Sequence, residues 1–183
     1  MVKKAIIVLA TGFEEIEAVT SIDILRRAGI EVTIAGLDSD NICGSHGINI
    51  IVDKKLDDIG ADFDACILPG GMPGAMHLSH SKKLTELIKK MNSKGNLIAA
   101  ICAAPAIVLA PIGVLNNKSA TCYPGMQNEF KENTLYKNEA VVVDGNIITS
   151  QCPGTAMDFA FAIVEKLAGK DSVKKLRKAM LAD

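Results

Sequence analysis

The stretch that decides the fold is LIAAICAAP, residues 97–105. Its first five residues are apolar and partly β-branched, which predicts a short strand buried on both faces, and the residues from Ala103 onward predict a helix. Cys102 then lies at the junction, beside the free N–H groups of the first helical turn. These groups and the helix dipole favour a thiolate. The alternative is a small buried core residue, the commonest role of an unpaired cysteine.

Outward from this stretch, the chain alternates predicted strands and helices. Strands are expected at 3–10 and 30–37, around a helix at 14–28 whose apolar stripe is Ile16, Val19, Ile22 and Leu25. The remaining expected elements are strands at 48–52 and 65–68, a loop at 69–74, helices at 81–94 and 103–110, a hairpin at 139–150, a long helix after Gly154, and a last helix at 171–180. This order predicts an α/β fold, a doubly wound sandwich of parallel strands with right-handed crossovers. At 183 residues, one domain spanning 1–183 is expected.

Composition excludes several classes of function. The net charge is −1 and the pI is near 6.3, so the chain shows neither a nucleic-acid footprint nor a basic membrane patch. The N-terminal apolar run is too short for a signal peptide, and no run approaches the roughly 18 residues that span a bilayer. The five cysteines are odd in number and widely spaced, which disfavours a disulfide framework. A cytoplasmic protein is expected.

The three histidines do not combine with cysteines at zinc-ligand spacing, so no metal site is predicted. His77 and His80 lie three residues apart and are interpreted as two surface histidines. A triad hydrolase is disfavoured too, because every histidine precedes Cys102 and none adjoins a candidate motif with an acidic partner.

Residues 11–17, the loop 69–74 and Cys102 all follow predicted strands, so they should meet at the carboxyl edge of the sheet. Glu14 and Glu15 are interpreted as stabilising the helix end, whereas Glu17 is expected to point over the sheet. Burial beside a thiolate raises the pKa of a carboxyl group, and protonated Glu17 could then donate a hydrogen bond to the sulfur.

The Pro-Gly-Gly sequence at 69–71 is typical of a turn, and one interpretation is that it has no further role. Placed beside the cysteine, however, the N–H groups of Gly71 and Ala103, with Gly70 in the same turn, could bind the oxyanion formed when sulfur attacks a carbonyl.

Four motifs in this order resemble the ThiJ/PfpI superfamily over nearly the whole chain, within the branch that contains the parkinsonism-associated deglycase and its bacterial relatives. They are FEEIE at 13–17, LPGG at 68–71, AAICA at 99–103 and SQCPGT at 150–155. The resemblance implies a flavodoxin-like three-layer sandwich with a mostly parallel central sheet, a homodimer, an elbow cysteine at Cys102, and a glutamate at Glu17 that bonds the sulfur.

The sequence also departs from its relatives. Those with protease-like activity carry histidine after the cysteine, where this chain has Ala103, which argues against a peptidase. Some close relatives place a histidine beside the cysteine where this chain has Tyr123, and arginines near the pocket are replaced by His46 and Gln151.

Two functions are open at this point. In the first, a cofactor-free glyoxalase or deglycase, Cys102 adds to the aldehyde of a small 2-oxoaldehyde and Glu17 moves the proton between its two carbons. In the second, a non-catalytic redox sensor or redox-regulated chaperone, Cys102 is oxidised to a sulfinate. Cys122 and Cys152 could act as resolving thiols, but incidental small residues are favoured.

Overall fold

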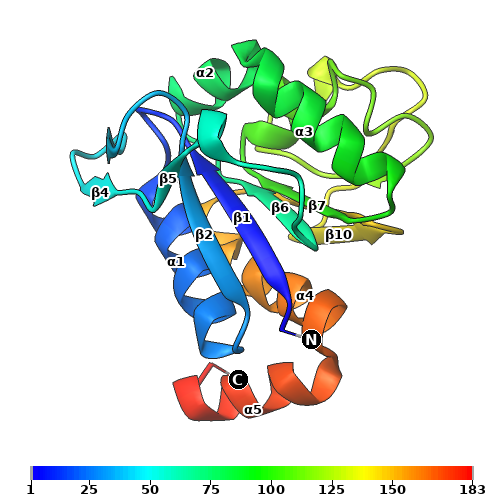
Figure 1. Ribbon diagram of the computed structural model, residues 1–183. Helices are drawn as coiled ribbons and strands as arrows, with labels where there is room; N and C mark the ends of the chain where they lie inside the picture. Colours follow the sequence, from blue (N-terminus) through cyan, green and yellow to red (C-terminus); the bar gives the residue numbers. More distant parts are fainter. Residues whose placement is uncertain (1, 183) are drawn as a thin grey trace.

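A seven-stranded sheet runs through the centre of the computed structural model, which describes residues 2–182 (Figure 1). Its strand order is β10-β11-β7-β6-β1-β2-β5, and every neighbouring pair is parallel except the β10–β11 hairpin. The strands are β1 (Lys4–Leu9), β2 (Glu31–Gly36), β5 (Lys54–Lys55), β6 (Ala65–Leu68), β7 (Leu97–Ile101), β10 (Val141–Asp144) and β11 (Ile147–Ser150). The predicted α/β fold with a mostly parallel sheet is confirmed.

Helices cover both faces of the sheet, which makes three layers (Figure 1). α1 (Glu15–Arg27), α4 (Ala156–Ala168) and α5 (Lys170–Met180) lie on one face, and α2 (Gly74–His80) and α3 (Lys82–Ser93) lie on the other. The short turns are η1 (Leu56–Asp58), η2 (Pro105–Leu109), η3 (Gln127–Glu129) and η4 (Pro153–Thr155). Two small sheets stand apart, the hairpin β3 (Asn41–Cys43) with β4 (Asn49–Ile51), and β8 (Ser119–Ala120) with β9 (Leu135–Tyr136). No helix within 2–182 combines the length and the apolar character needed to cross a membrane.

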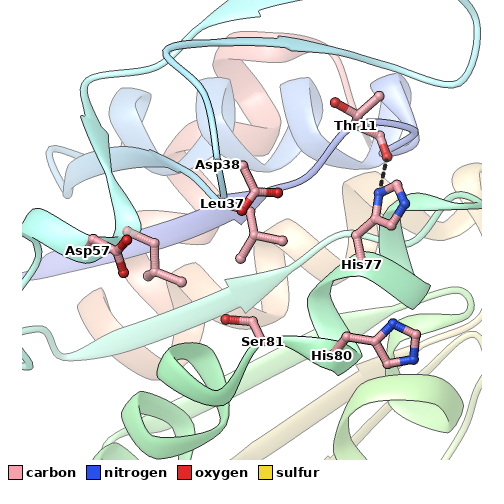
Figure 2. Close-up of a pocket in the computed structure, with 8 residues that line it drawn as sticks. Thr11, Leu37, Asp38, Asp57, His77, His80 and Ser81 are labelled. Atoms are coloured by element: carbon pink, nitrogen blue, oxygen red, sulfur yellow. Dashed lines mark hydrogen bonds between the residues drawn. The ribbon is translucent and has the colours of Figure 1, made fainter.

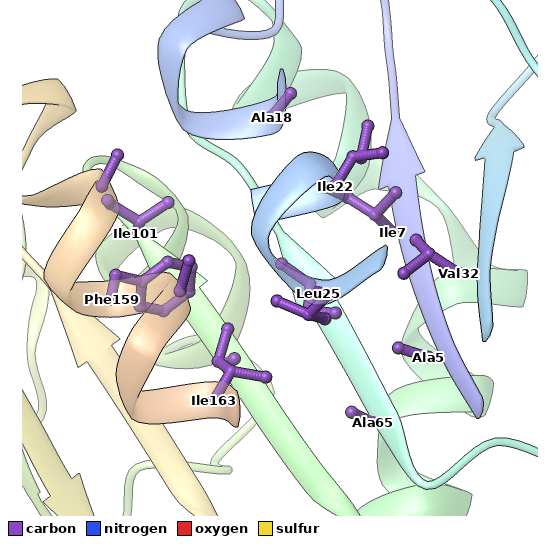
Figure 3. Close-up of a cluster of buried hydrophobic side chains, with 14 of the residues drawn as sticks. Ala5, Ile7, Ala18, Ile22, Leu25, Val32, Ala65, Ile101, Phe159 and Ile163 are labelled. Carbon is purple, nitrogen blue, oxygen red and sulfur yellow. The ribbon is translucent and has the colours of Figure 1, made fainter. Parts of the chain in front are cut away.

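Alternate residues of the buried strands supply two hydrophobic cores, one on each face of the sheet. On β1, Ile7 faces α1 and α4, whereas Ile6 and Val8 face α2 and α3. In the first core, Phe159 of α4 is fully buried, and the contact between α1 and α4 closes that layer (Figure 3). This packing fixes α1, and therefore its first turn, over the carboxyl ends of the strands.

The apolar stripe predicted for α1 is only partly right. Ile22 and Leu25 are buried, but Ile16 and Val19 are about half exposed, and the helix instead buries Glu17 and Ala18 against the sheet.

Two other predicted elements differ as well. Residues 74–80, predicted in part as loop, form α2, and the helix predicted from Ala103 to 110 is the single π-helical turn η2. Proline has no N–H to donate at the start of this turn, and the N–H of Ala110 reaches back five residues to the carbonyl of Pro105.

Candidate active site

Cys102 follows β7 with a backbone φ of 65°, in the left-handed region that costs a non-glycine residue about 1–3 kcal/mol. Two backbone hydrogen bonds hold this conformation. The N–H of Cys102 donates to the carbonyl of Ser150 at 3.0 Å, and the N–H of Tyr123 donates to the carbonyl of Cys102 at 2.8 Å. The predicted elbow is therefore present, and the side chain is 8% exposed at the carboxyl edge of the sheet.

Glu17 comes to the same place from the first turn of α1 and is fully buried. Its Oε2 accepts a hydrogen bond from the N–H of Gly70 at 2.7 Å. Its Oε1 lacks a well-aligned donor, although the carboxyl group lies close enough to Cys102 for each group to shift the pKa of the other. Oε1 is thus free to accept a proton and to donate it beside the sulfur.

The glycine turn after β6 packs directly on this pair. A Cβ atom on Gly70 would lie 2.6 Å from the Cβ and 3.0 Å from the sulfur of Cys102, so only glycine fits. Gly71 has a φ of 86°, and a side chain there would collide with the backbone of residues 12–14. The N–H groups of Gly71 and Ala103 lie near enough to the Cys102 sulfur to lower the pKa of its thiol, whereas the N–H of Gly70 donates to Glu17.

The thiolate expected for Cys102 from the helix N-terminus alone is not what its surroundings favour. Burial raises the pKa of the Cys102 thiol to about 12, with a further increase from the negative charge of Glu17, and the N–H groups of Gly71 and Ala103 lower it only in part. The sequence pattern showed the N–H donors but did not show how completely the sulfur is buried.

Burial also raises the pKa of Glu17, to about 7, against a lowering by the N–H of Gly70 and by Cys102. Two negative charges so close together in a buried site are strongly disfavoured, so the pair holds two protons below about pH 7 and one proton above it. That proton resides either on the thiol or on the carboxyl, and the second arrangement is a thiolate beside a neutral acid.

Of the other two glutamates of the FEEIE motif, Glu14 stabilises the helix end as predicted, whereas Glu15 does not. Glu14 caps α1 by accepting the N–H of Glu17 at 2.8 Å. Glu15 is 5% exposed, and its carboxylate binds the segment between β3 and β4. Glu14, Glu15 and His46 are also the one group of three potential metal ligands among residues 2–182, but hydrogen bonds within the protein account for their closeness.

His77 and His80 lie at a different place, in a recess of about 400 Å³ that contains neither Cys102 nor Glu17 (Figure 2). His77 donates from Nδ1 to the carbonyl of Thr11 at 3.1 Å. The recess is lined by Thr11, Leu37, Asp38, Leu56, Asp57, His77, His80 and Ser81. Both histidines are exposed, as predicted, and among the described residues no histidine is one of the groups that shift the pKa of Cys102. The site therefore has no Cys-His arrangement.

Sequence reasoning missed the backbone contributions of Ser150 and Tyr123, which hold the elbow from both sides. The SQCPGT motif and Tyr123 stand out in the sequence, but any residue type can form a main-chain hydrogen bond. The sequence therefore does not indicate which residues form these two. Cys122, one residue before Tyr123, is fully buried, and burial raises its pKa to about 11. No disulfide forms among the described residues, so a resolving role for Cys122 or Cys152 stays a prediction.

Comparison with known proteins bears on this arrangement. The sequence profile of the DJ-1/PfpI family matches residues 3–166, which is most of the chain and includes every site residue named above. The chain belongs to the DJ-1/PfpI family. The resemblance drawn from the four motifs is confirmed.

Three relatives illustrate the match. Protein dj-1beta of Drosophila melanogaster is 45% identical over 99% of this chain and 98% of its own length, and its crystal structure superposes with a TM-score of 0.96 at 44% identity over the whole of both chains. The glutathione-independent glyoxalase DJR-1.2 of Caenorhabditis elegans is 36% identical over 97% of this chain and 96% of its own. Oxidized DJ-1 of Toxoplasma gondii superposes with a TM-score of 0.94 at 38% identity, over 98% of each chain.

Proposed function

We propose that this protein is a cofactor-independent cysteine enzyme that converts small 2-oxoaldehydes to 2-hydroxy acids and acts on their early adducts, as a glutathione-independent glyoxalase or deglycase. The observation that carries the proposal is the buried pair of Cys102, on its strained elbow, and Glu17, with the glycine turn packed against both. The family relationship supports it, since one relative is named a glutathione-independent glyoxalase.

The reaction begins from the thiolate form of the pair, with the proton on Glu17. Sulfur adds to the aldehyde carbon, and the N–H groups of Gly71 and Ala103, which lie near the sulfur, are placed to stabilise the oxyanion that forms. Glu17 gives its proton to this oxygen, which leaves a hemithioacetal and a carboxylate.

The Glu17 carboxylate then removes the proton from the former aldehyde carbon and returns it to the neighbouring ketone carbon, while the hydroxyl proton passes from the first oxygen to the former ketone oxygen. The product is a thioester of a 2-hydroxy acid, and water releases the acid and regenerates the thiol. The sequence is redox-neutral and consumes only water. On an aminocarbinol or hemithioacetal adduct, attack of the sulfur on the carbinol carbon would displace the amine or thiol, which takes up the proton of Glu17. The same enzyme-bound hemithioacetal would form, and the released amine or thiol is the deglycated product.

Substitution of the nucleophile tests the proposal. Cys102→Ser should lower methylglyoxal turnover without glutathione by at least about 100-fold, because a hydroxyl is a far weaker nucleophile than a thiolate. Cys43→Ser, at a partly exposed cysteine of β3, is the matched control and should retain turnover. Lactate formation and methylglyoxal loss are followed together. Unchanged turnover in Cys102→Ser would show that the mechanism is wrong.

Redox sensing is the second candidate function, and the same sulfur supports it. As a sulfinate, Cys102 would present oxygens to the N–H groups of Gly71 and Ala103 and to protonated Glu17. Mild peroxide followed by mass spectrometry should show a selective gain of two oxygens on Cys102. Even oxidation across the five cysteines would contradict this function.

A homodimer is proposed as the working assembly, with a second copy of the chain covering the apolar surface of α1 and β4. Four apolar side chains on this surface are 46–81% exposed, namely Ile16 and Val19 on α1, Ile48 just before β4, and Ile51 at its end. Analytical ultracentrifugation should show a dimer that Ile51→Asp weakens. Leu135→Asp, at a similarly exposed residue of β9, should leave the assembly unchanged.

A further inference from the structure

Glu15 is a buried acid that the proposed mechanism does not use. Its Oε1 accepts hydrogen bonds from the N–H groups of His46 at 2.6 Å and Ile48 at 3.4 Å, and its Oε2 lies 2.9 Å from His46 Nδ1 and 3.2 Å from Ser45 Oγ. Although burial raises the pKa of Glu15, these bonds lower it to about 2. We call this carboxylate and its partners on 45–48 the Glu15 clasp.

Gly44 shows that the clasp is a close fit. A Cβ atom at this position would collide with the Glu15 carboxylate, so the chain can pass only because the residue is glycine. The segment that includes Gly44 is also tied to the start of α1 by its backbone. The N–H of Gly12 donates to the carbonyl of Cys43 at 2.8 Å, and the N–H of Ser45 donates to the carbonyl of Phe13 at 2.8 Å.

Residues 12–14 therefore lie between two layers. On the outer side is the segment 43–48, held by the Glu15 clasp, and on the inner side is the turn at Gly70 and Gly71. The N–H of Glu14 donates to the carbonyl of Gly70 at 3.0 Å, and the lack of a side chain on Gly71 lets residues 12–14 pack against it. The inner layer supplies the N–H that Glu17 accepts and an N–H for the sulfur.

We propose that Glu15 is a positioning residue for the Cys102–Glu17 pair, acting through the Glu15 clasp. The carboxylate holds segment 43–48 over residues 12–14. This outer layer keeps the glycine turn packed against the sulfur, and it keeps water away from Glu17. The proposal deepens the proposed function, because it assigns a further residue to the same site. The positioning of Cys102 and Glu17 by Glu15, however, does not depend on which substrate the site takes.

The test is the pH dependence of Cys102 alkylation by iodoacetamide, with the labelled residue identified by mass spectrometry. In the wild type, a step in rate is expected near pH 7, where the pair goes from two protons to one and its thiolate form first becomes available. The groups that face Glu17 are Glu14 from the start of α1 and Cys102 from the end of β7. In Glu15→Ala, water reaching Glu17 should move this step down by about one pH unit, because burial is the largest cause of the raised pKa.

Three further variants grade the effect. Glu15→Gln retains an acceptor for the backbone N–H groups and should shift the step by less than Glu15→Ala. Gly44→Ala should mimic Glu15→Ala by displacing an intact carboxylate. Glu86→Gln, at an exposed acid of α3, should leave the step unchanged. A merely structural role would lower the melting temperature without moving the step in the folded protein.

The outcomes separate the two proposals. If Glu15→Ala does not fold, Glu15→Gln and Gly44→Ala provide the same measurement. An unmoved step in folded Glu15 and Gly44 variants would overturn the positioning role. A step that moves as expected in a protein without methylglyoxal turnover would support the Glu15 clasp and contradict the proposed activity.

Discussion

The proton that the Cys102–Glu17 pair releases near pH 7 should make stability depend on pH, and Glu17→Gln isolates that dependence. The pKa of Glu17 is about 7 in the folded protein, against 4.5 ordinarily. Between these values the folded state retains a proton that the unfolded chain has released. Because the unfolded state binds fewer protons, the free energy of unfolding falls as the pH rises from 4.5 to about 7, and it levels off above that. At about 1.4 kcal/mol per pH unit, the loss is roughly 3 kcal/mol.

Urea unfolding of the wild type and Glu17→Gln between pH 4.5 and 8 measures this loss. Glutamine does not titrate, so the variant should gain roughly 3 kcal/mol relative to the wild type across the window. With a urea m-value of about 2 kcal/mol/M, the urea concentration at the unfolding midpoint of the wild type should fall by about 1.5 M relative to that of the variant as the pH rises across this window. Glu15 and His46 also titrate with shifted pKa values, but both are present in each protein and cancel in the difference.

Parallel stability curves over this pH range would refute the reasoning, because they would mean that Glu17 titrates as it does in water. The ultraviolet absorbance of a thiolate identifies which group carries the charge. An absorbance that rises near neutral pH and is lost in Cys102→Ala places the charge on sulfur. Its absence places the charge on Glu17, and the stability prediction holds in either case, since the pair as a whole loses one proton.

Two further predictions concern packing. Gly70→Ala should destabilise the fold by about 1–3 kcal/mol and slow alkylation of the active-site thiol, because its Cβ would overlap the cysteine, whereas Gly60→Ala, with no atom within 4 Å, should change neither. Phe159→Ala should cost about 3–5 kcal/mol in thermal or urea unfolding because it empties a fully buried position, whereas Met157→Ala, 43% exposed on the same helix, should stay within about 0.5 kcal/mol. Equal effects within either pair would contradict the packing described here.

Much of the fold could be predicted because apolar patterns report buried strands directly. The strands at 97–101 and 65–68 are predictable because a parallel sheet buried on both faces leaves continuous apolar runs, and the hairpin ending at Ser150 is predictable from its Asp144-Gly145 turn. α2 was not found, because the Gly-Gly-Met-Pro-Gly sequence before it is typical of a loop and the helix has only seven residues.

The wrong stripe on α1 has a physical cause. Ile16 and Val19 satisfy helical spacing as well as the truly buried face does, and hydrophobicity alone points to them. The helix buries Glu17 instead, because the N–H of Gly70, from a loop distant in sequence, donates to one of its two carboxyl oxygens. Sequence periodicity cannot show such a partner, and it also could not show that hydrogen bonds from residues 45–48 would stabilise the charged form of Glu15.

The main-chain donors of this site have a consequence for mutational scanning. Alanine substitution changes side chains, so it would report Cys102 and Glu17 but could not delete an N–H donor. Position 103 is already alanine, and an effect of alanine at Gly71 would report the collision of its Cβ with residues 12–14. The main-chain donors would then be missing from any functional map built that way. Replacing single peptide bonds with esters, which deletes one N–H and keeps every side chain, would reveal them.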